Sequence, residues 1–115
     1  MQVRELIQGG LHIVQIAGEV DMAGSPELRE VLAGHAEAQR AALLLDFTEV
    51  EYIDSSGLAT LVEYVQKSAA FGGRFAVGGL RESVQTIFDM VRLSEVFPVH
   101  ASVSGARAAL GESEA

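Results

Sequence analysis

The stretch that decides the fold is residues 50–58, which read Val50-Glu51-Tyr52-Ile53-Asp54-Ser55-Ser56-Gly57-Leu58. An apolar run of strand length lies upstream, at residues 43–47. Asp54 is a favourable helix N-cap, which makes residues 55–57 the first helical turn. Downstream, apolar residues recur with the spacing of one helical face, at Leu58, Leu61, Val62 and Val65. These residues predict a strand, a capped helix start and an amphipathic helix.

The chain before this stretch predicts a hairpin, a helix and a strand. Gly9-Gly10 suits a tight turn between strands at residues 3–7 and 11–17. Ser25 is expected to cap a helix that has Pro26 in its first position and ends near residue 38. The strand at residues 41–47 shows little alternation of polar and apolar residues, which indicates a central strand.

The chain after this stretch alternates between strand and helix. The helix that begins at Ser55 or Ser56 is expected to end at Gly72-Gly73. The expected elements that follow are a strand at 74–77, a helix through residues 84–91, an edge strand at 96–99 and a last helix capped by Ser102 or Ser104. The order β-β-α-β-α-β-α-β-α predicts an α/β fold, with a mixed sheet of four to five strands and about four helices packed on it.

Composition limits the classes of function. A chain of 115 residues has the length of one domain, and we expect a single domain over residues 1–111 and a flexible acidic tail at 112–115. Eight basic and 16 acidic residues give a net charge of −8, which disfavours nucleic acid or an anionic membrane as a partner. No signal peptide or membrane span is expected, and the chain has no cysteine for a disulfide or a thiolate zinc site. We therefore expect a cytoplasmic protein.

Patterns typical of enzymes are incomplete or absent. A nucleophile elbow needs glycine two residues before and two residues after its serine, whereas Ser55 has Ile53 and Gly57 there. A small hydrolase that uses Ser55 stays a weakly supported alternative. The sequence contains no phosphate-binding loop, and its three histidines are too far apart for a local metal-binding pattern. We expect no cofactor, no metal and no enzymatic activity.

Ser55 is better suited to being modified than to attacking a substrate. Free N–H groups and the helix dipole stabilise an anion at a helix N-terminus. Phosphorylation would add about −1.5 to −2 charges there. On a protein that is already acidic, this local change of charge makes a binding switch. His12 is interpreted as an ordinary strand residue and His35 as a partly exposed helix residue.

Three motifs give the chain a resemblance to a known family. Residues 18–21, Gly-Glu-Val-Asp, resemble the Gly-Glu-aliphatic-Asp signature that follows the second strand of STAS domains. Residues 52–58 resemble the Asp-Ser-Ser/Thr-Gly-Leu phosphorylation motif of that family, and residues 84–90 are similar to its apolar third helix. The resemblance extends from about residue 3 to residue 110 and is strongest to bacterial anti-sigma factor antagonists. It implies a STAS-type fold.

The resemblance also implies a mechanism. In this family the unphosphorylated antagonist binds an anti-sigma factor that is also a serine kinase of the histidine-kinase-like ATPase type, and the sigma factor is released. The kinase then phosphorylates the serine after the motif's aspartate, and a PP2C-type phosphatase restores the binding form. By position, Ser55 is the expected phosphorylation site. The expected partner-binding residues are Asp21, Asp54, Ser55, Ser56 and Gly57, where the small Gly57 would ease close approach of the partner.

Two positions depart from the family pattern. Ala59 stands where the family often has glycine, and residues 91–93 lack the glycine of a Gly-Leu step after the third helix. Neither departure touches Ser55. The alternative within the same family is a partner-switch module of a non-sigma pathway, such as a stress-sensing complex, secretion or motility control, or a transport accessory subunit.

Overall fold

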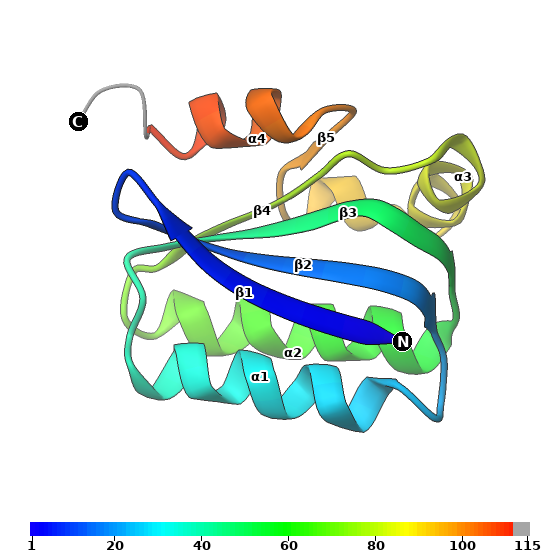
Figure 1. Ribbon diagram of the computed structural model, residues 1–115, viewed down its shortest axis with the longest axis horizontal. Coiled ribbons are helices and arrows are strands. Elements are labelled where there is room, and N and C mark those ends of the chain that lie inside the picture. The colour runs from blue at the N-terminus through cyan, green and yellow to red at the C-terminus, as the bar shows by residue number, and fades with distance from the viewer. Residues whose placement is uncertain (112–115) are drawn as a thin grey trace.

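The computed structural model describes residues 1–111 and has a five-stranded mixed sheet in the order β1-β2-β3-β4-β5 (Figure 1). The elements are β1 (Gln2–Gln8), β2 (Leu11–Val20), α1 (Ser25–Glu37), β3 (Ala42–Ile53), α2 (Ser55–Ala69), β4 (Arg74–Gly78), α3 (Glu82–Met90), the 3-10 helix η1 (Leu93–Glu95), β5 (Val99–His100) and α4 (Val103–Ala109). β1 is antiparallel to β2, and the other neighbouring strands are parallel. The predicted fold class and element order are confirmed. The expected acidic tail lies outside the described residues.

Helices cover both faces of the sheet. α1 and α2 pack against each other on one face, and α4 lies on the opposite face (Figure 1). Successive side chains of a strand point to opposite faces. Leu43 and Leu45 of β3 therefore join the larger core cluster, whereas Leu44 joins the smaller cluster with Ala106 of α4. All three leucines are fully buried, which confirms that β3 is a central strand.

β3 is longer than predicted. The sequence indicated a strand that ends near residue 47, followed by a connection, but β3 continues to Ile53 and pairs there with Val20 of β2. Pairing between β3 and β4 stops at Asp46, so the outer part of β3 is bordered by β2 alone. The sequence did not predict this part of the strand because most of its residues are polar and exposed. Val50 and Ile53 are buried and face the core. The extension carries the start of α2 beyond the body of the sheet.

The region after α3 also differs from the prediction. β5 is Val99–His100 rather than residues 96–99, because Phe97 turns into the core against Phe75 at a ring distance of 5.2 Å. β5 lies at the edge of the sheet, as expected. α3 ends without the family's glycine because Arg92 itself adopts the left-handed conformation, with φ of 57°.

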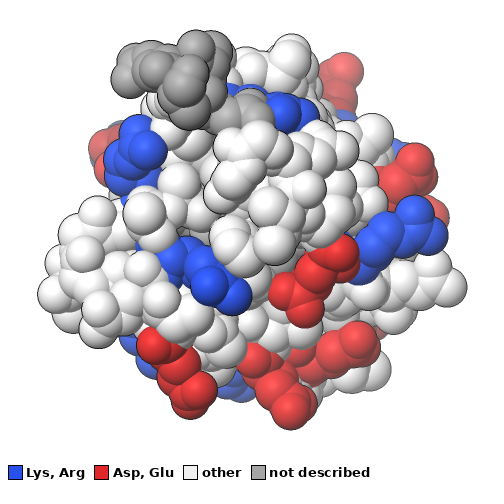
Figure 2. Space-filling view, turned by 60° about the vertical axis from the view of Figure 1, so that its left-hand side comes forward, with Lys and Arg blue, Asp and Glu red and all other residues white. Residues whose placement is uncertain are grey.

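Charged side chains are unevenly distributed over the surface. Figure 2 turns the left-hand end of Figure 1, which contains the β1–β2 turn, toward the viewer. On this face basic side chains stand apart from one another, and acidic side chains gather along the lower part of the view.

No helix of the described chain is long and apolar enough to cross a membrane.

Candidate functional site

The sheet brings the two motifs that precede α1 and α2 together. β2 and β3 are parallel neighbours, and their last residues, Val20 and Ile53, are partners in the register. The backbone N–H of Asp54 donates to the carbonyl oxygen of Val20 at 3.1 Å. Asp21 and Asp54, which are 33 positions apart in sequence, therefore follow adjacent strand ends at the same edge of the sheet.

Asp54 is the N-cap of α2, as predicted. Its carboxylate Oδ1 accepts from the backbone N–H of Ser56 at 2.9 Å, from that of Gly57 at 3.2 Å and from the Ser56 hydroxyl at 2.6 Å. The Ser56 hydroxyl is the main cause of a lowered pKa of Asp54, which the N–H groups of Gly57, Ser56 and Met22 lower further against partial desolvation. At neutral pH the start of α2 thus carries an ionised carboxylate whose Oδ1 already accepts three hydrogen bonds.

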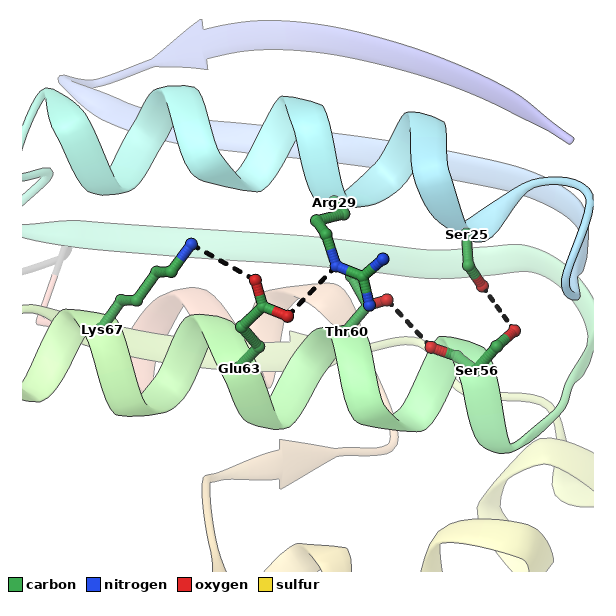
Figure 3. A network of polar contacts seen from close by, with 6 residues as sticks. All are labelled: Ser25, Arg29, Ser56, Thr60, Glu63 and Lys67. Atoms are coloured by element: carbon green, nitrogen blue, oxygen red, sulfur yellow. Dashed lines mark hydrogen bonds and ion pairs between the residues drawn. The ribbon is translucent and has the colours of Figure 1, made fainter.

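The two serines of the motif lie in different environments. Ser56 donates to Asp54, so its oxygen accepts the hydrogen of Ser25 at an Oγ–Oγ distance of 2.8 Å (Figure 3). The carbonyl oxygen of Ser56 accepts from Thr60 at 2.9 Å. Ser55 is exposed, and its hydroxyl has no hydrogen-bond partner within residues 1–111. Ser56 is therefore a structural hydroxyl, and Ser55 is an accessible one.

Ser25 does not have its predicted role. Gly24, not Ser25, is the N-cap of α1, and it makes no side-chain cap bond. The preceding turn is held by Asp21, whose Oδ1 accepts from the backbone N–H groups of Ala23 and Gly24, both at 3.1 Å. Ser25 is the first residue of α1, is 3% exposed and points at Ser56. The prediction failed because Ser25 lies one residue inside the helix, where its hydroxyl bonds to Ser56, while Asp21 holds the turn before the N-cap.

Gly57 faces the interior of the protein. A Cβ on Gly57 would lie 2.7 Å from Ile53 Cγ1, 2.8 Å from Val20 Cγ1 and 2.9 Å from the Val20 carbonyl oxygen. Glycine is needed here because the first turn of α2 sits directly on the ends of β2 and β3. Its small size therefore serves internal packing, and a contact between Gly57 and a partner stays a prediction.

Ion pairs hold α1 and α2 together beyond the serine pair. Glu63 of α2 pairs with Arg29 of α1 at 3.1 Å and with Lys67 at 3.3 Å (Figure 3). Hydrogen bonds from Lys67 and Arg29 lower the pKa of Glu63. Both ion pairs of Glu63 are exposed to solvent and are expected to contribute little to stability. It lies along the same α1–α2 seam as the Ser25–Ser56 bond, so the two helix starts are fixed relative to each other.

Two exposed apolar side chains flank the site and were not singled out in the sequence. Met22, next to Asp21, is 78% exposed, and Tyr52, near the end of β3, is 47% exposed. Large apolar side chains at an exposed polar site are typical of protein contact surfaces. Alternation along β3 would have found Tyr52, because buried Ile53 is its neighbour.

The site does not resemble a catalytic or metal centre. No described histidine forms a hydrogen bond with Ser55, so the hydrolase alternative gains no base from the structure. The described residues contain no group of three or more His, Cys, Asp or Glu side chains that could hold a metal ion. What the site offers is one free hydroxyl on a rigid, negatively charged helix start.

Comparison with known proteins identifies the family. The chain matches the STAS domain over residues 2–106. The anti-sigma-B factor antagonist of Bacillus subtilis (strain 168) is 35% identical over 92 residues, which cover 80% of this chain and 84% of that protein. The crystal structure of an anti-sigma factor antagonist from Mycobacterium paratuberculosis has a TM-score of 0.87 at 24% identity, covering 95% of this chain and 92% of that one.

A protein that is not named as an anti-sigma factor antagonist has the same fold. A sulfate transporter family protein from Wolinella succinogenes has a TM-score of 0.79 at 19% identity, and the match covers 96% of this chain and 93% of that one. The fold alone therefore does not decide the function. The family match spans nearly the whole chain, and the Bacillus subtilis relative covers four fifths of it. This chain belongs to the STAS domain family, in which its relatives include anti-sigma factor antagonists.

Proposed function

We propose that this protein is an anti-sigma factor antagonist that is switched by phosphorylation of Ser55. In its unphosphorylated form it binds an anti-sigma factor that is also a serine kinase of the histidine-kinase-like ATPase type, and the sigma factor is freed in the cytoplasm. The kinase phosphorylates Ser55 and the complex dissociates, and a PP2C-type phosphatase reverses the modification. The observation that carries the proposal is the contrast between exposed Ser55 and engaged Ser56.

The chemistry of the switch requires only an accessible hydroxyl on this protein. The γ-phosphoryl group of ATP is transferred to Ser55 Oγ, the hydroxyl proton leaves to a base of the kinase, and ADP is released. Ser55 meets this requirement because its hydroxyl makes no hydrogen bond within residues 1–111 that the reaction would break. Modification of Ser56 would disrupt its bonds to Asp54 and Ser25.

The change of charge at Ser55 accounts for loss of the complex. The N–H groups of Ser56 and Gly57 already bind the ionised Asp54 carboxylate, so they are not free to neutralise a phosphate. A phosphate with about −1.5 to −2 charges would then lie beside a like charge and remain hydrated. Hydration of the phosphate opposes burial of the neighbouring Met22 and Tyr52 side chains against a partner.

In the expected partner-binding surface, some residues hold the backbone in place and others are exposed for contact with a partner. Asp21 and Asp54 hold the two helix starts, and Ser56 and Gly57 fix their packing on the sheet. Of the five expected binding residues, Ser55 is the exposed one. Met22 and Tyr52 extend the expected contact to either side of it.

Incubation with the cognate kinase and ATP, followed by mass spectrometry, tests the assignment of the phosphorylation site. We expect one phosphate, on Ser55, in the wild type and none in Ser55→Ala. Ser56→Ala is the matched control and keeps phosphorylation, because it leaves the Ser55 hydroxyl in place. A phosphate on Ser56 or elsewhere, or none at all, contradicts the proposal.

The second candidate is a partner-switch module of a non-sigma pathway, such as stress sensing, secretion or motility control, or transport. The fold shared with a sulfate transporter family protein favours keeping this candidate. Affinity capture with and without ATP discriminates between the two. Recovery of a histidine-kinase-like ATPase whose bound sigma factor is displaced supports the antagonist, whereas recovery of a transporter or a stress-sensing assembly supports the alternative.

A further inference from the structure

The two edges of the sheet differ in how they are protected from pairing with another strand. β5 forms one edge; it has only two residues and follows Pro98, which has no N–H to donate. β1 forms the other edge and has seven residues, without a proline, a lysine or a break in its register with β2 (Figure 1). Short strands, proline and irregular pairing protect sheet edges, so β1 is the open edge.

Every second residue of β1 points its backbone N–H and C=O away from the sheet. Gly9-Gly10 is a two-residue turn in which both glycines have positive φ, so the flanking residues Gln8 and Leu11 form a hydrogen-bonded pair. Such pairs alternate along antiparallel strands, so the even-numbered residues of β1 bond to β2. The outward-facing residues are Val3, Glu5 and Ile7. Within residues 1–111 no strand lies beyond β1, so these residues keep groups for a further strand.

The middle outward-facing residue, Glu5, is held in a fixed orientation. Its Oε1 lies 2.6 Å from His35 Nε2, and His35 Nδ1 accepts from Arg40 Nε at 3.1 Å. Since Nδ1 accepts, the ring proton is on Nε2 and is donated to Glu5. His35 is 5% exposed, so the expectation of a partly exposed residue is wrong. The Glu5 side chain is 52% exposed, which leaves its second carboxylate oxygen for a cation.

Apolar side chains flank Glu5 on the same face of β1. Val3 and Ile7 point to the same side of the sheet as Glu5, because each lies two residues away along the strand. Val3 is partly buried against the core, and Ile7 is 62% exposed. Arg4 points to the opposite side and is exposed. The edge thus offers an apolar–acidic–apolar pattern on one face and a basic side chain on the other.

A second copy of this chain fits the edge poorly. In the antiparallel register that pairs all seven residues of two β1 strands, each Glu5 lies opposite the Glu5 of the other copy. Moving the register by two residues toward the N-terminus brings Arg4 opposite Arg4 instead. Like charges that face each other directly are destabilising, and each copy also has a net charge of −8. Charge therefore selects a partner strand of different sequence, with a basic residue opposite Glu5.

From these observations we propose that β1 is a docking edge, which binds an extended segment of another protein as a further antiparallel strand. The segment carries Lys or Arg opposite Glu5, an acidic residue opposite Arg4, and apolar residues opposite Val3 and Ile7. Main-chain hydrogen bonds supply the affinity, and the facing side chains supply the specificity. β1 lies two strands away from β3, which precedes Ser55, so the inference does not rest on the phosphorylation switch.

A synthetic peptide with blocked ends and the sequence Thr-Val-Thr-Lys-Glu-Ile-Thr is the probe. Paired antiparallel with β1, it places its Lys opposite Glu5, its Glu opposite Arg4, and its apolar residues opposite Ile7 and Val3. Amide hydrogen exchange of the full chain, measured by NMR at saturating peptide, tests the proposal. We expect slower exchange at Val3, Glu5 and Ile7, and no change at Arg4 and Leu6, whose N–H groups already bond to β2. Absence of this alternation overturns the proposal.

The matched control peptide, Thr-Val-Thr-Glu-Lys-Ile-Thr, has the same composition with Lys and Glu exchanged. It places like charges opposite both Glu5 and Arg4, so we expect it to bind about tenfold more weakly. Glu5→Gln keeps an acceptor for His35 and removes one of the two charges, so it should reduce this difference to about threefold. Equal binding of the two peptides to the wild type overturns the assignment of the partner's charge pattern.

Ile7→Pro removes one outward N–H and leaves the hydrogen bonds between β1 and β2 in place, so it should abolish peptide binding. Ile7→Val keeps the N–H and should retain binding; equal binding by the two variants overturns the proposal. Slow exchange at Val3 and Glu5 that grows with protein concentration, without peptide, would mean that a second copy fills the edge, which overturns the assignment of the partner. Ser55→Asp should bind the peptide like the wild type, which separates this edge from the Ser55 switch.

Discussion

The starts of α1 and α2 contain the same parts in different arrangements. Each helix follows a parallel strand, each is preceded by an aspartate, and the first residue of each is a serine, Ser25 or Ser55. Asp54 caps α2 directly, whereas residues 22–24 separate Asp21 from α1. Ser25 is 3% exposed and bonded to Ser56, whereas Ser55 is exposed. Two serines in the same position of similar helix starts therefore differ in whether a partner can reach them.

The largest difference between these helix starts is expected in partner binding. Ser55→Asp places a negative charge where the phosphate would be and should weaken binding of the anti-sigma factor by about 1–3 kcal/mol, roughly 5- to 150-fold. Ser55→Ala should retain binding. Ser83→Asp is the matched control, because Ser83 is an exposed serine in the first turn of α3. Isothermal titration calorimetry measures the affinity of all three variants for the anti-sigma factor. Equal weakening by Ser55→Asp and Ser83→Asp would show that the position of the charge at Ser55 has no special effect on binding.

The glycines near the two helix starts should differ in their effect on stability. Gly57→Ala forces a Cβ to within 3 Å of three atoms, one of them a backbone oxygen, and should lower the free energy of unfolding by about 1–3 kcal/mol. At Gly24 the nearest atoms, at 3.0 Å, belong to the Met1 side chain, which can move. Gly24→Ala should therefore cost less than about 1 kcal/mol. Urea denaturation measures both, and equal losses would show that Gly57 has no special packing role.

The serine pair between the helices should contribute less than the packing at Gly57. Ser25→Ala and Ser56→Ala should each lower the free energy of unfolding by about 1 kcal/mol, because each removes a partner from a partly buried hydrogen bond. Both changes touch the same bond, so a double-mutant cycle should give a coupling of about 0.5–1.5 kcal/mol. Ser55→Ala is the control and should leave stability unchanged. Additive losses would mean that the bond contributes nothing to the docking of α1 on α2.

The smallest expected effect is the pH dependence of the Asp54 cap. The folded pKa of Asp54 lies below its ordinary value of 3.8, so its contribution to stability is present above that pH and is lost as the pH falls through the folded pKa. Wild type should therefore be more stable than Asp54→Asn at neutral pH, and the gap should narrow below about pH 3.8. Thermal unfolding across this range measures it. A gap that is the same at pH 3 and pH 7 would contradict the lowered pKa.

The contrast between the two caps also shows what the sequence could predict. The Asp54 cap depends on atoms two to three residues away, so local pattern was sufficient for α2 and its cap. The role of Ser25 depends on Ser56, 31 positions along the chain, and the need for Gly57 depends on Val20. These contacts exist only once β2 and β3 have paired, which no local pattern contains.

Burial was the other property that residue type alone did not predict. The outer half of β3 has the polar composition of a loop, but it forms a strand because Val50 and Ile53 face the core and the polar residues face solvent. His35 is buried because Glu5, from the first strand, supplies its partner at 2.6 Å. Both outcomes depend on neighbours distant in sequence.

The central claim is that the state of one hydroxyl, that of Ser55, decides whether the partner binds. The most direct measurement is the affinity of the captured anti-sigma factor for unmodified protein and for protein that carries phosphate on Ser55 alone. We predict binding at least about tenfold weaker for the phosphorylated form, since a change of that size is typical of coupling in such switches. Equal affinity for the two forms, or tighter binding of the phosphorylated one, would contradict the account.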